Sequence, residues 1–554
     1  MLRLQEIRSY LLMWFADMIL YRLGSIVTKD IQSEKRKIER CCALVKKILG
    51  RIIIVIPAIA LQALWYLVML GFLNDLFDGY LWNAINALLS VLAVVFVTGL
   101  VAKRDESSYK LLWVMVIVAM PILGALLYFL LGNKNTGKKL KKKLEQSASS
   151  LSNMISHDDK TCETAIRDDD LRIGQTLARI SHATGFPIVK NDTSKYYPLG
   201  EDMFRDMCED LKRAEKYIYV EYFIIQSGKF WDTLADIMAQ KASEGVDVRV
   251  MYDDLGSIGT FSVLDVIGLS KKGIKCTPFN PFLFIKSQLN NRDHRKIMVI
   301  DGKVAYSGGI NLADEYINET HPYGIWKDIG FRLTGKAVQS YTYMFAEFWN
   351  AFSNDKIMAE YLNFFEEDKK QEENGYVLPY YDSPMRDEHM SNELFIEILS
   401  SATSYVWFYT PYLMLGDALY DAFIRAAERG VDVRIIMPGI PDKKMIYRLS
   451  RSYYMDLLRA GVKIYEYTPG FAHAKAFVAD DKIAGIGTVN LDYRSLFLHF
   501  ECNAVFYKAD IIWNLKKDYL ATQNESRERT EGDIKKGLLY RFGNNVLRLI
   551  APLL

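Results

Sequence analysis

The chain has 554 residues, 50% of them hydrophobic, and its 69 basic residues nearly balance its 67 acidic ones, for a formal net charge of +2. This length exceeds one domain and this hydrophobicity excludes a disordered chain, so we expect a membrane region plus one large or two smaller globular units. The near-neutral charge excludes a whole-chain signature of nucleic-acid binding.

Three apolar segments crowd the first quarter of the chain, at about residues 52–73, 81–101 and 111–131. Each has about the 20 residues that a helix needs to cross a hydrocarbon core ~30 Å thick. Residues 2–20 are interrupted by charges such as Arg3 and Arg8, which favours an interfacial amphipathic helix over a further span. The sequence therefore predicts a multi-pass membrane region over residues 1–132.

The basic residues around these segments leave the sidedness of the membrane region open. Those before residue 52 place the amino end in the cytoplasm, and three crossings would then leave the carboxyl-terminal part outside. Six lysines between positions 134 and 143 favour the cytoplasm instead. The same lysines can be a solvated tether or can attract anionic lipid head groups.

Beyond a polar stretch at 133–195, predicted to be a linker with lead-in helices, the sequence repeats itself. Each half contains a helix, a strand, a second helix ending at a glycine, a second strand beginning VDVR, and a further helix that ends in the last segment given below. In the first half, 196–365, these elements fall at 203–214, 217–225, 230–244, 246–254 and 271–279. In the second half, 366–554, they fall at 393–402, 405–415, 417–429, 431–439 and within 457–467. The alternation predicts an α/β fold with one sheet per half and helices on its faces.

One motif, His-x-Lys-x-x-x-x-Asp, occurs once in each half and is followed by an asparagine 17 residues after its histidine. The residues are His294, Lys296, Asp301 and Asn311, then His473, Lys475, Asp480 and Asn490. With only 7 histidines in the chain, two copies that share the asparagine are not expected by chance. We therefore predict one site that draws on both halves.

The motif suits a phosphate group. Lysine supplies a point charge, asparagine an amide donor, and an imidazole can act as nucleophile or as acid and base. The two aspartates belong to the candidate catalytic set by their place in the motif. However, Asp301 has the opposite strand parity to His294 and precedes a glycine, so it is expected to fix the turn, and the same holds for Asp480.

No metal is expected in this site, because the lysines and asparagines already balance the charge of a phosphate. The 6 cysteines form neither a C-x-x-C motif nor a zinc spacing, so we expect free thiols without a disulfide framework or structural metal. The remaining histidines are expected to be ordinary core or surface residues: His157, His182, His321, His389 and His499.

These residues resemble the phospholipase D superfamily and, within it, the bacterial cardiolipin synthases. The resemblance extends from about residue 85 to the end, through PILGALLYFLLG (121–132), the first motif and GTVNLDYRSLFLHFE (487–501). It implies two phospholipase D-like α/β halves that form one pseudo-twofold catalytic unit, behind a helical transmembrane anchor in a bacterial cell membrane. The extra span at 52–73 departs from the family's two-span pattern.

The resemblance also implies an activity without a cofactor. A phosphatidyl group passes from one phosphatidylglycerol to another through a phosphohistidine, which gives cardiolipin and glycerol. His294 would be the nucleophile and His473 the general acid, although this order could be reversed. Glu501 would orient His294 and Asp328 would orient His473. Two residues before the motif asparagines stand Gly309 and Thr488, so the phosphate cradle is expected to be lopsided.

Two other functions remain open on the sequence. A membrane-bound phosphodiesterase that hydrolyses phospholipid or, less favoured, nucleic acid would share the motif, and spacing cannot show what resolves the intermediate. An inactive membrane scaffold would be expected to have lost a histidine or lysine, and both sets are intact. The membrane region favours lipid and no nucleic acid as partner, and the oligomeric state is not predicted.

Overall fold

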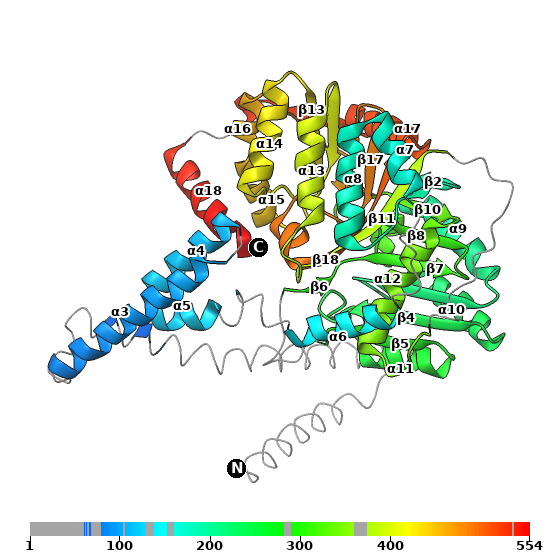
Figure 1. Ribbon diagram of the computed structural model, residues 1–554, viewed down its shortest axis with the longest axis horizontal. Helices are drawn as coiled ribbons and strands as arrows, with labels where there is room; N and C mark the ends of the chain where they lie inside the picture. The colour runs from blue at the N-terminus through cyan, green and yellow to red at the C-terminus, as the bar shows by residue number, and fades with distance from the viewer. Residues whose placement is uncertain are drawn as a thin grey trace, which may run out of the picture. The chain divides into compact units, whose positions relative to one another are not determined.

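The computed structural model (Figure 1) describes residues 79–103, 106–128, 138–151, 160–281, 290–358, 374–534 and 537–553, together with the isolated positions 60, 62–63, 66–67 and 132. The chain divides into the units Met1–Pro57 and Ala58–Leu554, and only the second is described here. The predicted interfacial helix at 2–20 and nearly all of the predicted span at 52–73 lie outside the described residues.

The described part of the predicted membrane region forms three helices: α3 (Gly79–Val101), α4 (Ser107–Ala119) and α5 (Pro121–Leu127). The prediction of one continuous helix over 111–131 is wrong. The helix breaks at Met120 (φ −133°, ψ 76°), because the ring of Pro121 disfavours helical backbone in the residue before it. Across the described residues, we find no helix that combines the length and apolar character needed to cross a bilayer, so the transmembrane anchor stays a prediction.

The first half forms a mixed seven-stranded sheet whose spatial order is β2 (Ser194–Tyr197), β10 (Gly330–Thr334), β8 (Val304–Gly308), β7 (Lys296–Ile300), β3 (Tyr217–Tyr222), β4 (Asp247–Asp253) and β5 (Lys275–Phe279). Strands β3, β4 and β5 are parallel, whereas β7 pairs antiparallel with β3 and β8. Helices α9 (Gly200–Lys212), α10 (Lys229–Ser243) and α11 (Val263–Lys271) connect its strands.

The second half repeats this order. Its main path is β1 (Val189–Lys190), β11 (Tyr376–Asp382), β18 (His499–Tyr507), β17 (Ile483–Gly487), β16 (Ala476–Ala479), β12 (Tyr405–Tyr409), β13 (Asp432–Pro438), β14 (Lys463–Tyr467) and β19 (Ser526–Arg529). Its helices are α13 (Met390–Ser401), α14 (Asp417–Glu428), α15 (Lys444–Ser452), α16 (Tyr454–Arg459) and α17 (Ile511–Asn524). Seven strands of this path match the first sheet position by position. In spatial order, β11, β18, β17, β16, β12, β13 and β14 correspond to β2, β10, β8, β7, β3, β4 and β5. This correspondence confirms the duplicated α/β halves.

One helix joins the two halves. Helix α12 (Ala337–Phe352) is buried over nearly its whole length and packs on strands of the first sheet and on β11 of the second. Its aromatic side chains, among them Phe345 and Phe348, lie in a hydrophobic core to which both halves contribute. The halves are therefore parts of one body in this region.

The predicted linker at 133–195 also contributes to this body. It contains α6 (Lys138–Ser150), α7 (Thr161–Asp169) and α8 (Leu171–Thr184), of which α6 packs on α12 and α8 packs on α13 and β11. The lysine-rich α6 buries Leu140 and Leu144, one turn apart, toward the core. The remaining elements are the 3-10 helices η5 (Asp314–Ile317), η8 (Glu531–Asp533) and η9 (Ala551–Leu553), the π-helix η7 (Arg494–Leu498) and α18 (Leu538–Ile550).

Candidate active site

Two short parallel strand pairs carry the motif histidines to the junction of the halves. Strand β6 (Arg292–Asp293), just before His294, pairs with the start of β18 in the second half. Strand β15 (Gly470–Ala472), just before His473, pairs with β9 (Ile325–Lys327) in the first half. Each half thus holds the loop of the other half's histidine.

Backbone hydrogen bonds extend each pairing to the histidine itself. The amide of His294 donates to the carbonyl of Phe500 (2.9 Å), and the amide of His473 donates to the carbonyl of Lys327 (2.7 Å). In both cases the accepting residue directly precedes an acidic residue, Glu501 or Asp328. The strand register therefore brings each carboxylate next to the imidazole of the opposite half.

The two carboxylates bind the imidazoles through the same ring nitrogen. Nδ1 of His294 lies 2.9 Å from both carboxylate oxygens of Glu501, and Nδ1 of His473 lies 2.6 Å from Oδ2 of Asp328. Both carboxylates are fully buried. A carboxylate on Nδ1 fixes the tautomer and leaves Nε2 of each ring for a reacting group. The structure thus pairs the histidines and acidic residues as predicted.

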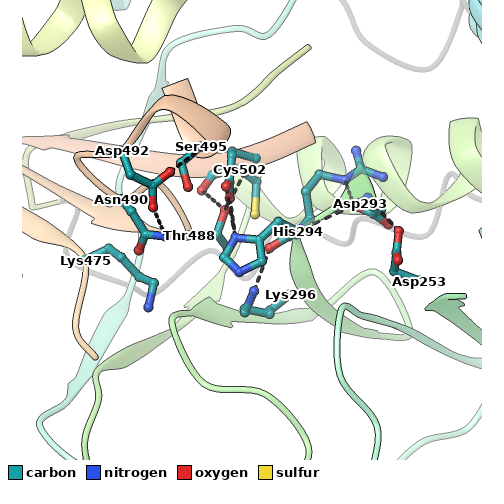
Figure 2. Close-up of polar contacts among 12 residues, drawn as sticks. Asp253, Asp293, His294, Lys296, Lys475, Thr488, Asn490, Asp492, Ser495 and Cys502 are labelled. Carbon is teal, nitrogen blue, oxygen red and sulfur yellow. Dashed lines mark hydrogen bonds and ion pairs between the residues drawn. The ribbon is translucent and has the colours of Figure 1, made fainter. Parts of the chain in front are cut away.

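The motif lysines lie beside these rings. Nζ of Lys296 donates to the carbonyl of His294 (2.7 Å), and Nζ of Lys475 donates in the same way to the carbonyl of His473. In Figure 2, His294 and Lys296 of the first half lie alongside Lys475 and Asn490 of the second half. All four of these side chains are buried, so residues of both repeats meet at one place.

Burial shifts the pKa values of these groups toward their neutral forms. It holds the pKa of His294 well below its usual range, with Lys296 as the next cause, and lowers that of His473 to about 4, with Lys475 next. Burial also lowers the pKa of Lys296 to about 8 and that of Lys475 to about 7, although Glu501 and Asp328, respectively, oppose the shift. A bound anion would favour the protonated forms of these four groups again, so the dry site is suited to receive an anion.

The motif asparagines lie at the site but make different contacts. Asn311 accepts a hydrogen bond from the Ile224 amide (3.1 Å) and donates to the Tyr316 hydroxyl (2.8 Å). Asn490 donates to Asp492 (3.1 Å), and its buried Oδ1 has no hydrogen-bond partner among the described residues. The two cradles are therefore chemically unequal.

The residues two positions before the asparagines explain part of this inequality. Thr488 donates a hydrogen bond to Glu501 and accepts one from the Cys502 amide (2.9 Å). At the matching position, Gly309 leaves the space that the Asp328 carboxylate occupies, since a β-carbon there would lie 2.1 Å from Oδ1. The two cradles thus differ together with their acidic residues: Thr488 accompanies Glu501, whereas Gly309 accompanies Asp328.

The placement of Asp301 and Asp480 in the catalytic set is contradicted by their surroundings. The Asp301 carboxylate accepts three bonds of 2.7–2.8 Å from the backbone amides of residues 215–217, and Asp480 binds the amides of residues 403–405 likewise. Both have positive φ, 54° and 50°, at the turn after the strand. Seven residues of extended chain, about 20 Å, separate them from the histidines, so they anchor the next strand instead of reacting.

His499, which was expected to be an ordinary core or surface residue, lies beside the site. Its ring is centred 6.1 Å from that of His294, and its Nε2 is buried without a hydrogen-bond partner among the described residues. The available signal was strand parity, because His499 stands two residues before Glu501 in β18 and so shares its face.

A buried ion pair supporting the first motif was also missed. Arg295 binds Glu221 at 2.6 Å with both side chains fully buried, and its guanidinium lies 3.4 Å from the centre of the Phe348 ring on α12. This contact ties the loop of His294 to the central helix. Spacing alone gives no sign of it.

The described residues contain no group of three or more His, Cys, Asp or Glu side chains arranged to hold a metal ion. The four described cysteines, Cys162, Cys208, Cys276 and Cys502, are free thiols.

Comparison with protein families gives two matches. Residues 207–349 and 395–521, one segment in each half, match the family described as cardiolipin synthase, PLD-like domain. Residues 88–133 match the phospholipase D-nuclease N-terminal family. A cardiolipin synthase 2 of Bacillus cereus is 34% identical over 82% of this chain and 88% of its own length. The chain belongs to the cardiolipin synthase family.

Other relatives of this cardiolipin synthase family member agree in extent. An uncharacterised protein of Streptococcus mutans is 43% identical over 82% of this chain and 98% of its own length. Among solved structures, phosphatidylserine synthase of Haemophilus influenzae superposes with a TM-score of 0.52 at 14% identity, covering 68% of this chain and all of that one. This likeness concerns the fold alone.

Proposed function

We propose that this chain is a phosphatidyltransferase that makes cardiolipin and glycerol from two molecules of phosphatidylglycerol. The observation that carries the proposal is the pair of buried imidazoles, each held at Nδ1 by a carboxylate of the other half. Two histidines and two lysines around one phosphorus atom supply a nucleophile, an acid and base, and charge for the non-bridging oxygens.

In the first step, Nε2 of His294 attacks the phosphorus of one phosphatidylglycerol. The N–P bond forms, the P–O bond to the glycerol head group breaks, and His473 gives its proton to the departing glycerol oxygen. Glu501 stabilises the positive charge that develops on His294. The pKa of His294 well below its usual range keeps this ring neutral, as a nucleophile requires.

In the second step, the primary hydroxyl of another phosphatidylglycerol attacks the phosphohistidine. Its oxygen forms the new P–O bond, the N–P bond breaks, and the hydroxyl proton passes to His473. One phosphodiester replaces another, so no nucleotide is required. His473 needs a proton before the first step, and the negative charge of the bound phosphodiester offsets the burial and the lysines that lower its pKa in the empty site.

The membrane placement belongs to this proposal as well. Residues 1–132 would form a multi-pass anchor in a bacterial cell membrane, which would hold the site close to its lipid substrates. A second substrate in place of water distinguishes this transferase from a phospholipid hydrolase, whose product would be phosphatidic acid.

The test incubates the full-length protein, in membranes, with phosphatidylglycerol alone and separates the lipid products. We expect cardiolipin and free glycerol, and at least about a 10³-fold loss for His294→Asn because no other group replaces the nucleophile. The exposed His182 on α8 is the matched control, and His182→Asn should leave the rate unchanged. Phosphatidic acid as the main product, or cardiolipin output unaffected by His294→Asn, would overturn the proposal.

A further inference from the structure

The C-terminal helix α18 (red in Figure 1) presents its apolar side outward. Leu538, Leu539 and Phe542 are 83%, 86% and 66% exposed, and Val546, one turn further, is 44% exposed. These positions fall on one face of a helix. A surface helix normally turns such a face to the core, so an outward stripe marks an interaction site.

The opposite face of α18 holds the helix on the body. Tyr540 and Asn544 contact Arg448 of α15, which lies 4.9 Å from the Tyr540 ring centre and 3.3 Å from Oδ1 of Asn544. Arg548 donates to the Ser452 hydroxyl (3.2 Å) and lies 4.6 Å from the ring centre of Tyr453. Polar contacts thus fix the helix, and no described residue covers its apolar face.

A basic pocket of about 310 Å³ lies beside this helix, between α15, α16 and α18. Its lining holds four arginines and one carboxylate: Arg451, Arg459, Arg541, Arg548 and Asp456. Three of the arginines are paired with carboxylates: Arg451 with Glu466, Arg459 with Glu531 and Arg548 with Asp456 (3.5 Å). Arg541 alone has no ion pair among the described residues, which leaves its guanidinium for an anion. Arginine forks of this kind suit phosphate oxygens.

We propose that α18 docks on an anionic lipid bilayer, with its apolar face among the acyl chains and a lipid phosphate in the arginine pocket. An apolar stripe beside a cluster of cations is the pattern of an interfacial helix. Helix α18 and the following η9 also contact α4, where the predicted span at 111–131 begins. The inference rests on the proposed function, in which the substrate is itself a bilayer lipid.

The first test places the photoreactive residue benzoylphenylalanine at Phe542 of the full-length protein in vesicles of phosphatidylcholine and phosphatidylserine. Irradiation should give adducts with acyl chains. The control position is Trp513 on α17, an aromatic residue of similar exposure at 56%, where lipid adducts should be absent. Adducts at Phe542 with a second copy of the chain, or with residues 1–59 of the same chain, would overturn the inference.

The second test concerns the pocket. Arg541→Gln should lower the adduct yield about fivefold in vesicles with phosphatidylserine and leave it unchanged in phosphatidylcholine alone, because one cation near an anionic surface is lost. Arg205→Gln, on α9 of the first half, is the matched control without effect. Equal yields with and without phosphatidylserine would remove the arginine pocket from the inference.

Adduct formation requires no turnover, so the same labelling in the His294→Asn variant separates the two proposals. Cardiolipin synthesis without lipid adducts at Phe542 would overturn the docking of α18 alone. Lipid adducts without cardiolipin synthesis would overturn the proposed function alone.

Discussion

At the scale of single residues, Gly309 shows how little space the site leaves. A β-carbon at this position would lie 2.1 Å from Oδ1 and 3.0 Å from Oδ2 of Asp328. Gly309→Ala must therefore displace the carboxylate that holds His473. We expect kcat for cardiolipin formation to fall at least about 100-fold with a smaller change in KM, since the misplaced acid and base acts on the transition state.

The matched control for this substitution is Gly268 in α11, where an added β-carbon meets nothing within 4 Å. Gly268→Ala should keep full activity and raise stability by about 1 kcal/mol through helix propensity. Steady-state kinetics and thermal unfolding of both variants check the pair. Normal kcat in Gly309→Ala would show that the Asp328 contact does not matter for the reaction.

At the scale of elements, the motif aspartates clamp the start of a neighbouring strand. Asp301 binds the amides that lead into β3, and it is only 4% exposed. Asp301→Asn keeps the positive φ, which asparagine tolerates, but leaves one amide without its carboxylate oxygen. We expect a loss of about 1–3 kcal/mol in unfolding free energy, with kcat preserved in the folded protein.

Denaturant unfolding and product assays below the transition check this separation of stability from rate. Asp202→Asn on the exposed surface of α9 is the control and should change stability by less than about 0.5 kcal/mol. A large fall in kcat without a fall in stability would return Asp301 to the reacting groups.

At the scale of the whole molecule, the buried site makes stability depend on pH. The pKa of His473 is lowered to about 4 in the folded protein, from about 6.5 for an unfolded histidine. Between these values the unfolded chain binds more protons, so stability rises with pH from about 4 to 6.5. For His473 this amounts to roughly 3 kcal/mol, lost as the pH falls through that window.

Thermal unfolding midpoints at pH 7 and pH 4.5 measure this dependence. We expect His473→Gln to lose less stability on acidification than the unmodified protein, because its side chain takes up no proton. The exposed His182→Gln should behave like the unmodified protein. Identical acid sensitivity in all three proteins would contradict the burial of a neutral His473.

The sequence predicts those structural features that depend on residues close to one another along the chain. The helices and strands of each half, including the stops at Gly245 (φ 96°) and Gly430 (φ 87°), follow from periodicity and backbone preference. The position of Asp301 on the opposite strand face from His294 also predicts that its side chain stabilises a turn. The predicted helix at 2–20 and nearly all of the predicted span at 52–73 lie outside the described residues, and the break at Met120 was overlooked although Pro121 signals it.

The features that spacing cannot predict depend on how two sheets meet. The pairing of Glu501 with His294 was expected only from resemblance, and it depends on β6 joining the second half. Arg295 and Glu221 meet for a related reason, because β3 pairs with β7 within the first sheet although the two residues lie far apart in sequence. A local pattern specifies which face a side chain takes, but not which element of the other half lies against that face.

The crossed attachment of the histidines has a consequence for how such a protein can evolve. Since β18 supports His294 and β9 supports His473, neither repeat is a working unit by itself. A substitution that shifts β18 alters chemistry encoded some 200 residues earlier, so selection acts on both repeats together. We infer that losing either repeat would disarm the other, because each histidine would be left without the strand and the carboxylate that hold it.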